Sequence, residues 1–161
     1  MATHNIKKTN VARLLDQAKV AYELVPYEVD PDNLAATHVA ESLGEDIRQV
    51  FKTIVMTGDK VKYFVCVVPG GKEVNLKLAA KVSGNKKCEP LPMKELLPLT
   101  GYIRGGCSPI GMKKQFPTFI DDSATAFPHI FVSAGQRGLQ LKIAPRDLAA
   151  QSHAEFVALT M

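Results

Sequence analysis

The chain has 161 residues, of which 46% are hydrophobic and 22% charged, and its formal net charge is +4 at pH 7. These values are typical of a soluble globular protein, so we expect residues 1–161 to form a single domain and exclude an intrinsically disordered chain. No apolar run reaches the roughly 20 residues that span a bilayer, and the N-terminal stretch lacks the apolar region of a secretory signal, which predicts a cytoplasmic protein with no membrane partner.

The cysteine and histidine residues form neither a metal-site pattern nor a disulfide pattern. Cys66, Cys88 and Cys107 are far apart and make no CxxC pair, and the four histidines make no HxH or HExxH pattern. An odd number of isolated cysteines does not suit a disulfide framework. We therefore expect no disulfide, no metal ion and no other cofactor.

Hydrophobic periodicity and turn residues predict helices interspersed with strands. In chain order these are helix 11–18, strand 22–29, helix 38–43, strands 51–58 and 60–71, helices 76–83 and 93–99, strands 118–121, 129–134 and 139–144, and helix 145–161. The two β-rich runs that meet at Gly58–Asp59 predict a hairpin. This order favours a mixed-sheet α/β or α+β domain over a uniform doubly wound parallel fold.

Short polar residues, glycines and prolines predict where the helices begin and end. The expected N-caps are Thr9 or Asn10, Thr37 and Asn75, the expected helix-ending glycines are Gly44 and Gly84, and Pro145 is expected in the first turn of the last helix. Pro26 interrupts strand 22–29, which suits an edge strand or a bulge.

The segment Gly101–Lys114, GYIRGGCSPIGMKK, is rich in glycine and in basic residues. Gly106 and Gly111 bracket four residues, as in a phosphate-binding P-loop, but Met112 follows where that motif has lysine. Pro109 also removes a backbone N–H from a loop whose N–H groups would hold the phosphate. The sequence therefore excludes a P-loop.

Two interpretations of this loop remain open from the residues alone. With positive φ at Gly105 and Gly106, a ligand can approach the backbone closely, and the N–H groups of Gly106, Cys107 and Ser108 can bind an anion or a developing oxyanion. The other interpretation is a surface turn between two strands.

Cys107 in this loop also raises the hypothesis of a cysteine nucleophile. His129 is the one histidine in a β-rich run of the C-terminal half and is the candidate base. No sequence pattern places the two side chains together, and a lone cysteine is more often a small packing residue.

Lys52 is the most unusual residue of the predicted strands. In FKTIVM the alternation of a strand places Lys52 on the same face as Ile54 and Met56. A lysine on an apolar face either extends to the rim or meets an anion or a carbonyl group in a pocket. Ser133, at the end of a later strand, is a second candidate for a polar pocket wall.

Three lysine doublets contribute to the basic charge of the chain. They are Lys7–Lys8, Lys86–Lys87 and Lys113–Lys114, and no aromatic residues alternate with them as in an RNA-binding motif. One interpretation is solubility, and the other is a discontinuous basic rim along a nucleic-acid backbone.

Four motifs occur together and in order: VFKTIVM, GYIRGGCSPIGMKK, PTFIDDSA and HIFVSAGQRGLQLKI. Together they resemble the YbaK/EbsC family, whose members are close relatives of the editing domain inserted in prolyl-tRNA synthetases. The similarity covers essentially the whole chain. It implies one mixed α/β domain with a strongly curved, barrel-like sheet flanked by helices.

The resemblance also implies a set of site residues. The lysine of the family matches Lys52, and the expected substrate-binding residues are Tyr27, Thr53, Gly105, Gly106, Cys107, Ser108, Pro109, Gly111 and Ser133. Two positions depart from the pattern. Gln140 stands where relatives often have aspartate, and Leu34 where some have an aromatic residue.

The activity that the resemblance implies is deacylation in trans of mischarged aminoacyl-tRNA, above all Cys-tRNA(Pro), with prolyl-tRNA synthetase as a partner. The thiol of the substrate cysteine would attack its own ester, while Lys52 would hold the terminal phosphate or ester region and the N–H groups of 106–108 would support the carbonyl oxygen. The alternatives are an Ala-tRNA(Pro) deacylase, a Cys107-dependent thiol hydrolase and a tRNA-binding module without turnover.

Overall fold

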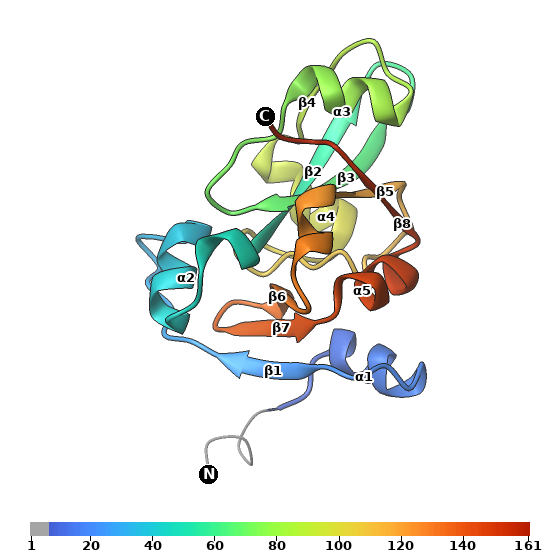
Figure 1. Ribbon diagram of the computed structural model, residues 1–161. Helices are drawn as coiled ribbons and strands as arrows, with labels where there is room; N and C mark the ends of the chain where they lie inside the picture. Colours follow the sequence, from blue (N-terminus) through green and yellow to red (C-terminus); the bar gives the residue numbers. More distant parts are fainter. Residues whose placement is uncertain (1–6) are drawn as a thin grey trace.

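The computed structural model describes residues 7–161, and residues 1–6, the start of the stretch searched for a secretory signal, lie outside the described residues. The helices are α1 (Asn10–Gln17), α2 (Ala36–Leu43), α3 (Leu76–Ser83), α4 (Leu96–Thr100) and α5 (Pro145–Ser152). The strands are β1 (Glu23–Pro26), β2 (Phe51–Gly58), β3 (Tyr63–Pro69), β4 (Cys88–Pro90), β5 (Thr118–Asp121), β6 (Ile130–Gln136), β7 (Leu139–Ile143) and β8 (Ala154–Val157). Figure 1 shows β1, β6 and β7 toward one end of the molecule and α3 with β4 at the other.

The strands form two sheets. The smaller sheet is antiparallel with the order β1–β7–β6, and the larger has the order β4–β2–β3–β5–β8. In the larger sheet β4, β2 and β3 are antiparallel, whereas β3, β5 and β8 run parallel. The predicted hairpin and the predicted mixed α/β fold are confirmed, although the described strands make two sheets rather than one closed barrel.

The continuous apolar run of β3 follows from its position inside the larger sheet, where both of its faces are buried. Val65 and Val67 face the main core between the two sheets, whereas Phe64 and Val68 face the layer that contains α3. A third cluster packs α2 against the junction of the two sheets. The molecule therefore has a sheet-on-sheet core with helices on its outer sides (Figure 1).

Most of the predicted helix ends are confirmed. Thr9 and Asn75 each accept a hydrogen bond from a backbone N–H three residues later, at 3.3 and 3.0 Å. Gly44 and Gly84 follow α2 and α3 in the left-handed conformation, and Pro145 is the first residue of α5. Local sequence rules are sufficient here because each cap is an interaction within one turn.

The predicted cap of α2 is wrong. The helix begins at Ala36, so Thr37 lies inside its first turn, and Ala35 precedes it without a side-chain hydrogen bond. Thr37 instead lines the cavity described below.

The predicted helix over 145–161 is also wrong beyond Ser152. His153 ends α5 with φ 54°, and the next residues pair with β5 as the parallel strand β8. Ala154 and Phe156 pack against the main core. This segment is a strand because it is buried beside β5, and no local sequence pattern indicates that β5 will be its partner.

Smaller differences concern element lengths. β1 spans Glu23–Pro26 rather than 22–29, and the short edge strand β4 was not expected. The helix expected over 93–99 is a 3-10 turn, Met93–Glu95, followed by α4. None of the helices described within residues 7–161 is both long and apolar enough to cross a bilayer.

One contact between the sheets positions the functional site. An isolated parallel bridge between Val50 and Phe131 joins the start of β2 to β6 of the smaller sheet. It brings the first residues of β2, which include Lys52, close to the strands that carry Ser133 and Gln140.

Candidate active site

A cavity of about 720 Å³ lies where the two sheets, α2 and the glycine-rich segment Gly101–Lys114, called the glycine loop below, meet. Its walls come from the start of α2, the first half of β2, the loop after β3, the segment before α4, and the strands β6 and β7. Val39, Val50 and Leu91 give it an apolar lining. Its volume lies in the range of about 300–1,000 Å³ that is usual for small-ligand sites.

Lys52 lies on the wall of this cavity. Its side chain is 22% exposed, and its Nζ lies 3.3 Å from Oε1 of Glu73, whose side chain is 94% exposed. An ion pair with so exposed a partner contributes little to stability, and the carboxylate readily turns to water. The Lys52 ammonium is therefore available to an anionic or carbonyl group that enters the cavity.

Two residues that line the cavity each carry a buried side-chain oxygen with no hydrogen-bond partner among residues 7–161. The two oxygens are Oγ1 of Thr53 and Oε1 of Gln140, and the Gln140 residue is only 5% exposed. Leaving such a group unsatisfied costs about 1–3 kcal/mol. Both oxygens are covered by surrounding atoms, so either would accept a hydrogen bond from a bound molecule only after its side chain shifts.

Ser133 also lines the cavity, opposite Gln140 in the β6–β7 pair. Its Oγ accepts a hydrogen bond from the N–H of Gly135 at 3.2 Å, which holds the side chain at the irregular end of β6. The position of Ser133 beside the cavity agrees with the pocket wall expected from the sequence.

The glycine loop packs against the turn between β6 and β7. Gly105 has φ +82°, as expected, but Gly106 is not among the residues with positive φ. A Cβ atom on Gly106 would lie 3.2 Å from Cα of Gln136, and the N–H of Gly106 donates to the carbonyl of Ile103 at 2.9 Å. The expectation that this N–H faces a ligand is therefore wrong, because the loop itself uses it.

The next two residues keep their backbone donors free. The N–H groups of Cys107 and Ser108 make no hydrogen bond within residues 7–161, and Cys107 lines the cavity. The Oγ of Ser108 accepts from the N–H of Ile110 at 3.3 Å, which fixes the loop from inside. Cys107 lines the cavity and Ser108 does not, so the N–H of Cys107 is the remaining candidate for the predicted anion or oxyanion site.

Cys107 has the properties of a packing residue. It is 7% exposed and belongs to the main core, and burial raises the pKa of its thiol to about 12. His129, the candidate base, is exposed and does not line the cavity. A thiol that stays protonated at neutral pH and lacks a base is a poor nucleophile.

We expect Cys107→Ala to keep deacylase activity within about threefold of the unchanged protein, because the thiolate is not needed. Thiol labelling provides the matching measurement. At pH 7.5 Cys88, which is half-buried, should react before Cys107, and raising the pH should accelerate the Cys107 reaction because the thiolate fraction rises toward pH 12. Loss of activity in Cys107→Ala with an unchanged Tm would contradict this assignment.

Five of the expected site residues lie away from the cavity wall, and one of them is Gly106. Pro109 and Gly111 line a separate hollow of about 290 Å³ beside α1, and the side chain of Ser108 is fully buried. Tyr27 packs on the cluster that contains Val39 and does not line the cavity. The structure thus brings together Lys52, Thr53, Gly105, Cys107 and Ser133.

Two charged residues of the cavity were not singled out from the sequence. Glu73 comes from the loop after β3 and pairs with Lys52, and Arg104 precedes the two glycines of the loop. Arg104 directly precedes Gly105 and Gly106, and a basic residue in that position of a possible anion-binding loop is a sequence signal for a site residue. Among residues 7–161, no three histidine, cysteine, aspartate or glutamate side chains lie together as metal ligands.

Residues 30–150 match the aminoacyl-tRNA editing domain. The chain belongs to this family. It is also 47% identical over 154 residues to EbsC of Enterococcus faecalis, a protein named provisionally as a Cys-tRNA(Pro)/Cys-tRNA(Cys) deacylase. The aligned region covers 96% of this chain and 94% of EbsC. The family predicted from the four motifs is confirmed.

Solved structures share the fold of this chain. One, described provisionally as a trans-editing enzyme for prolyl-tRNA synthetase, has a TM-score of 0.80 at 21% identity and covers 96% of this chain and 99% of that one. Another, the hypothetical protein APE2540, has a TM-score of 0.86 at 18% identity, with 95% and 100% covered. Both support the mixed α/β architecture.

Proposed function

We propose that this editing domain is a trans-acting deacylase that removes cysteine from Cys-tRNA(Pro). The observation that carries the proposal is the composition of the cavity: Lys52 stands at its wall, with unpartnered buried acceptors on Thr53 and Gln140. EbsC, which matches nearly the whole chain, carries the name of that activity.

The polar groups of the cavity suit the parts of an aminoacyl ester. The α-ammonium of the amino acid is a donor, and a shift of either side chain would bring it within reach of Thr53 Oγ1 or Gln140 Oε1, which have no other partner. The N–H of Cys107, a residue that lines the cavity, is free to donate to the carbonyl oxygen. Lys52 then faces the ribose oxygen or the terminal phosphate.

The proposed step uses a nucleophile that the substrate supplies. The thiol sulfur of the cysteinyl group attacks its own carbonyl carbon, an S–C bond forms, and the bond from that carbon to the ribose oxygen breaks. The thiol proton ends on the ribose oxygen, which leaves a free tRNA 3′ end and a cysteine thiolactone that water opens to cysteine. Lys52 stabilises the negative charge that develops on the leaving oxygen.

A separate editing site is physically necessary for a small amino acid. Missing atoms change binding to a synthetase pocket by only about 1–3 kcal/mol, so an amino acid smaller than proline enters the proline pocket too often. A second site that removes the smaller amino acid from tRNA(Pro) restores the accuracy of aminoacylation. We therefore propose prolyl-tRNA synthetase as a partner, the whole chain as one editing domain, and the cytoplasm, where tRNA is charged, as its location.

A deacylation panel tests the proposal. Cys-, Ala- and Pro-tRNA(Pro) and Cys-tRNA(Cys) are incubated with the protein, and the charged fraction is followed over time. We expect cysteine to leave tRNA(Pro) at least about tenfold faster than alanine, because only cysteine has the attacking thiol, and proline to stay. Preferential loss of alanine would assign an Ala-tRNA(Pro) deacylase, and inertness toward all four substrates would contradict catalysis and favour a binding module.

A further inference from the structure

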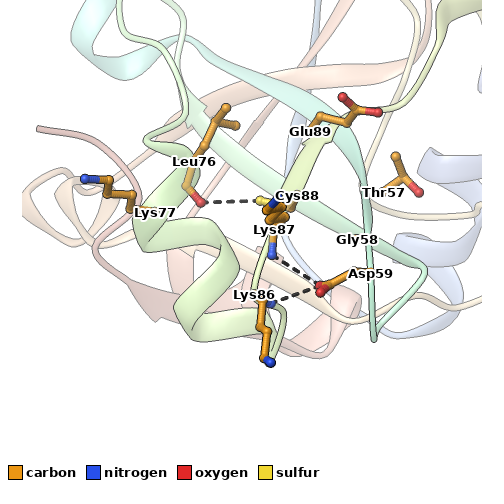
Figure 2. A pocket seen from close by; sticks show the side chains of 9 residues that line it. All are labelled: Thr57, Gly58, Asp59, Leu76, Lys77, Lys86, Lys87, Cys88 and Glu89. Atoms are coloured by element: carbon orange, nitrogen blue, oxygen red, sulfur yellow. Dashed lines mark hydrogen bonds between the residues drawn. The ribbon is translucent and has the colours of Figure 1, made fainter.

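A second hollow lies at the far end of β2, away from the cavity beside Lys52. It measures about 580 Å³ and is formed by the end of β2, the start of α3 and the turn that leads into β4. Figure 2 shows Lys77 on one side of it and Lys86 on another, both extending outward. We call this hollow the lysine groove.

The residues around the lysine groove carry a concentrated positive charge. Segments 57–62 and 76–89 contain six lysines, namely Lys60, Lys62, Lys77, Lys81, Lys86 and Lys87, and only two acidic residues, Asp59 and Glu89. Their net charge of four equals that of the whole chain, so the rest of the chain is neutral overall. None of these lysines makes a salt bridge to a residue within 7–161.

Asp59 does not neutralise the lysine side chains by direct pairing. Its Oδ1 accepts hydrogen bonds from the backbone N–H groups of Lys86 and Lys87, at 2.9 and 3.2 Å, as Figure 2 shows. These backbone bonds lower the pKa of the Asp59 carboxyl. The carboxylate therefore fixes the turn, while the two ammonium groups stay free.

A buried amide joins the two turns that carry the lysines. Oδ1 of Asn85 accepts from the N–H groups of Lys60 and Val61, at 2.8 and 2.7 Å, and its Nδ2 donates to the carbonyl of Val61 at 3.2 Å. Asn85 is 9% exposed, so this link is shielded from water. The lysines of both turns thus project from a rigid base, which lowers the entropy lost when they bind a ligand.

The lysine groove and the catalytic cavity share two strands. β2 carries Lys52 near its start and Thr57 at the groove, five residues or about 17 Å along the strand. β4 contributes Cys88 and Glu89 to the groove and Pro90 to the cavity. At about 3.4 Å per stacked nucleotide, this separation corresponds to roughly five nucleotides.

We propose that the lysine groove binds the phosphate backbone of the tRNA acceptor end, a few nucleotides from the ester held beside Lys52. This inference rests on the proposed function and adds the surface that receives the tRNA. Lysines on rigid turns suit a phosphate backbone because point charges neutralise phosphates without reading bases. The contribution to affinity is therefore salt-dependent and independent of sequence.

The test compares the protein with the variant Lys77→Ala/Lys86→Ala/Lys87→Ala. The matched control, Lys7→Ala/Arg13→Ala/Arg146→Ala, removes the same charge from exposed positions away from the groove. Filter binding of uncharged tRNA(Pro) at several salt concentrations gives the affinity and its salt slope. We expect the groove variant to bind about tenfold more weakly, with a slope smaller by about 2, and the control to change far less.

Deacylation assays separate this inference from the proposed function. The groove variant should show a raised KM for Cys-tRNA(Pro) with kcat nearly unchanged, and normal cleavage of a small cysteine ester without tRNA. Equal tRNA affinity and salt slope in the groove variant and the control would overturn the inference, even if the groove variant lost binding to the synthetase. If the unchanged protein, the groove variant and the control all failed to cleave Cys-tRNA(Pro), the proposed function would be refuted. The filter-binding result would still show whether the lysine groove binds tRNA.

Discussion

Replacing Lys52 by alanine is expected to lower kcat/KM for Cys-tRNA(Pro) by about a hundred- to a thousandfold. The loss has this size because one positioned donor to a developing negative charge contributes that much in comparable sites. Lys52 is the cavity residue whose ammonium is held only by a 94% exposed partner. Single-turnover deacylation with the protein in excess measures the effect without interference from product release.

Two matched variants separate the charge of Lys52 from its structural role. Lys52→Arg keeps the positive charge but changes its geometry, and we expect partial activity. Glu73→Gln removes the exposed partner, and we expect a change of no more than about threefold. Activity of Lys52→Ala within a few-fold of the unchanged protein, at equal Tm, would show that this lysine is not part of the reaction.

Replacing Gly106 by alanine is expected to lower kcat/KM by about tenfold while the protein stays folded. The added Cβ would lie 3.2 Å from Cα and 3.3 Å from the carbonyl carbon of Gln136, both backbone atoms that do not rotate away. The loop must then move off the β6–β7 turn and carry the free N–H groups of Cys107 and Ser108 with it. A displacement near 1 Å in a reacting geometry costs about a hundredfold, and the shift of a few tenths of an ångström needed here places the expected loss near tenfold.

Gly44→Ala is the control for the Gly106 variant. Its Cβ would meet nothing within 4 Å, although the residue has φ +69° after α2. This control should lose stability through backbone strain alone and keep full activity. If Gly106→Ala behaves in the same way, the glycine loop has a structural role and the oxyanion assignment to its backbone is wrong.

Much of this fold follows from local rules. The Thr9 and Asn75 caps, the glycines after α2 and α3, and the β2–β3 hairpin each depend on residues close together in sequence. Position 52 was also identifiable, because a lysine among apolar alternating residues needs an explanation. These features are the ones in which neighbouring residues determine the conformation.

The remaining features depend on partners far apart in the chain. The tail after Ser152 is a strand because β5 offers it a parallel edge, some 35 residues earlier in sequence by the Thr118–Ala154 pair. Gly106 lies against the backbone of Gln136 in the β6–β7 turn, 30 residues later in sequence, and Gln140 reaches the cavity wall because β7 does. The hydrophobic periodicity of a sequence does not indicate which strands lie side by side or which hydrogen-bonding groups they leave without a partner.

The central claim is that the cavity beside Lys52 positions a substrate thiol and supplies no nucleophile of its own. The most direct measurement compares release from Cys-tRNA(Pro) with release from S-methylcysteinyl-tRNA(Pro), two esters that differ by one methyl group on sulfur. We predict rapid loss of cysteine and no release of S-methylcysteine above the rate without protein. Equal cleavage of both esters, or no cleavage of Cys-tRNA(Pro), would contradict it.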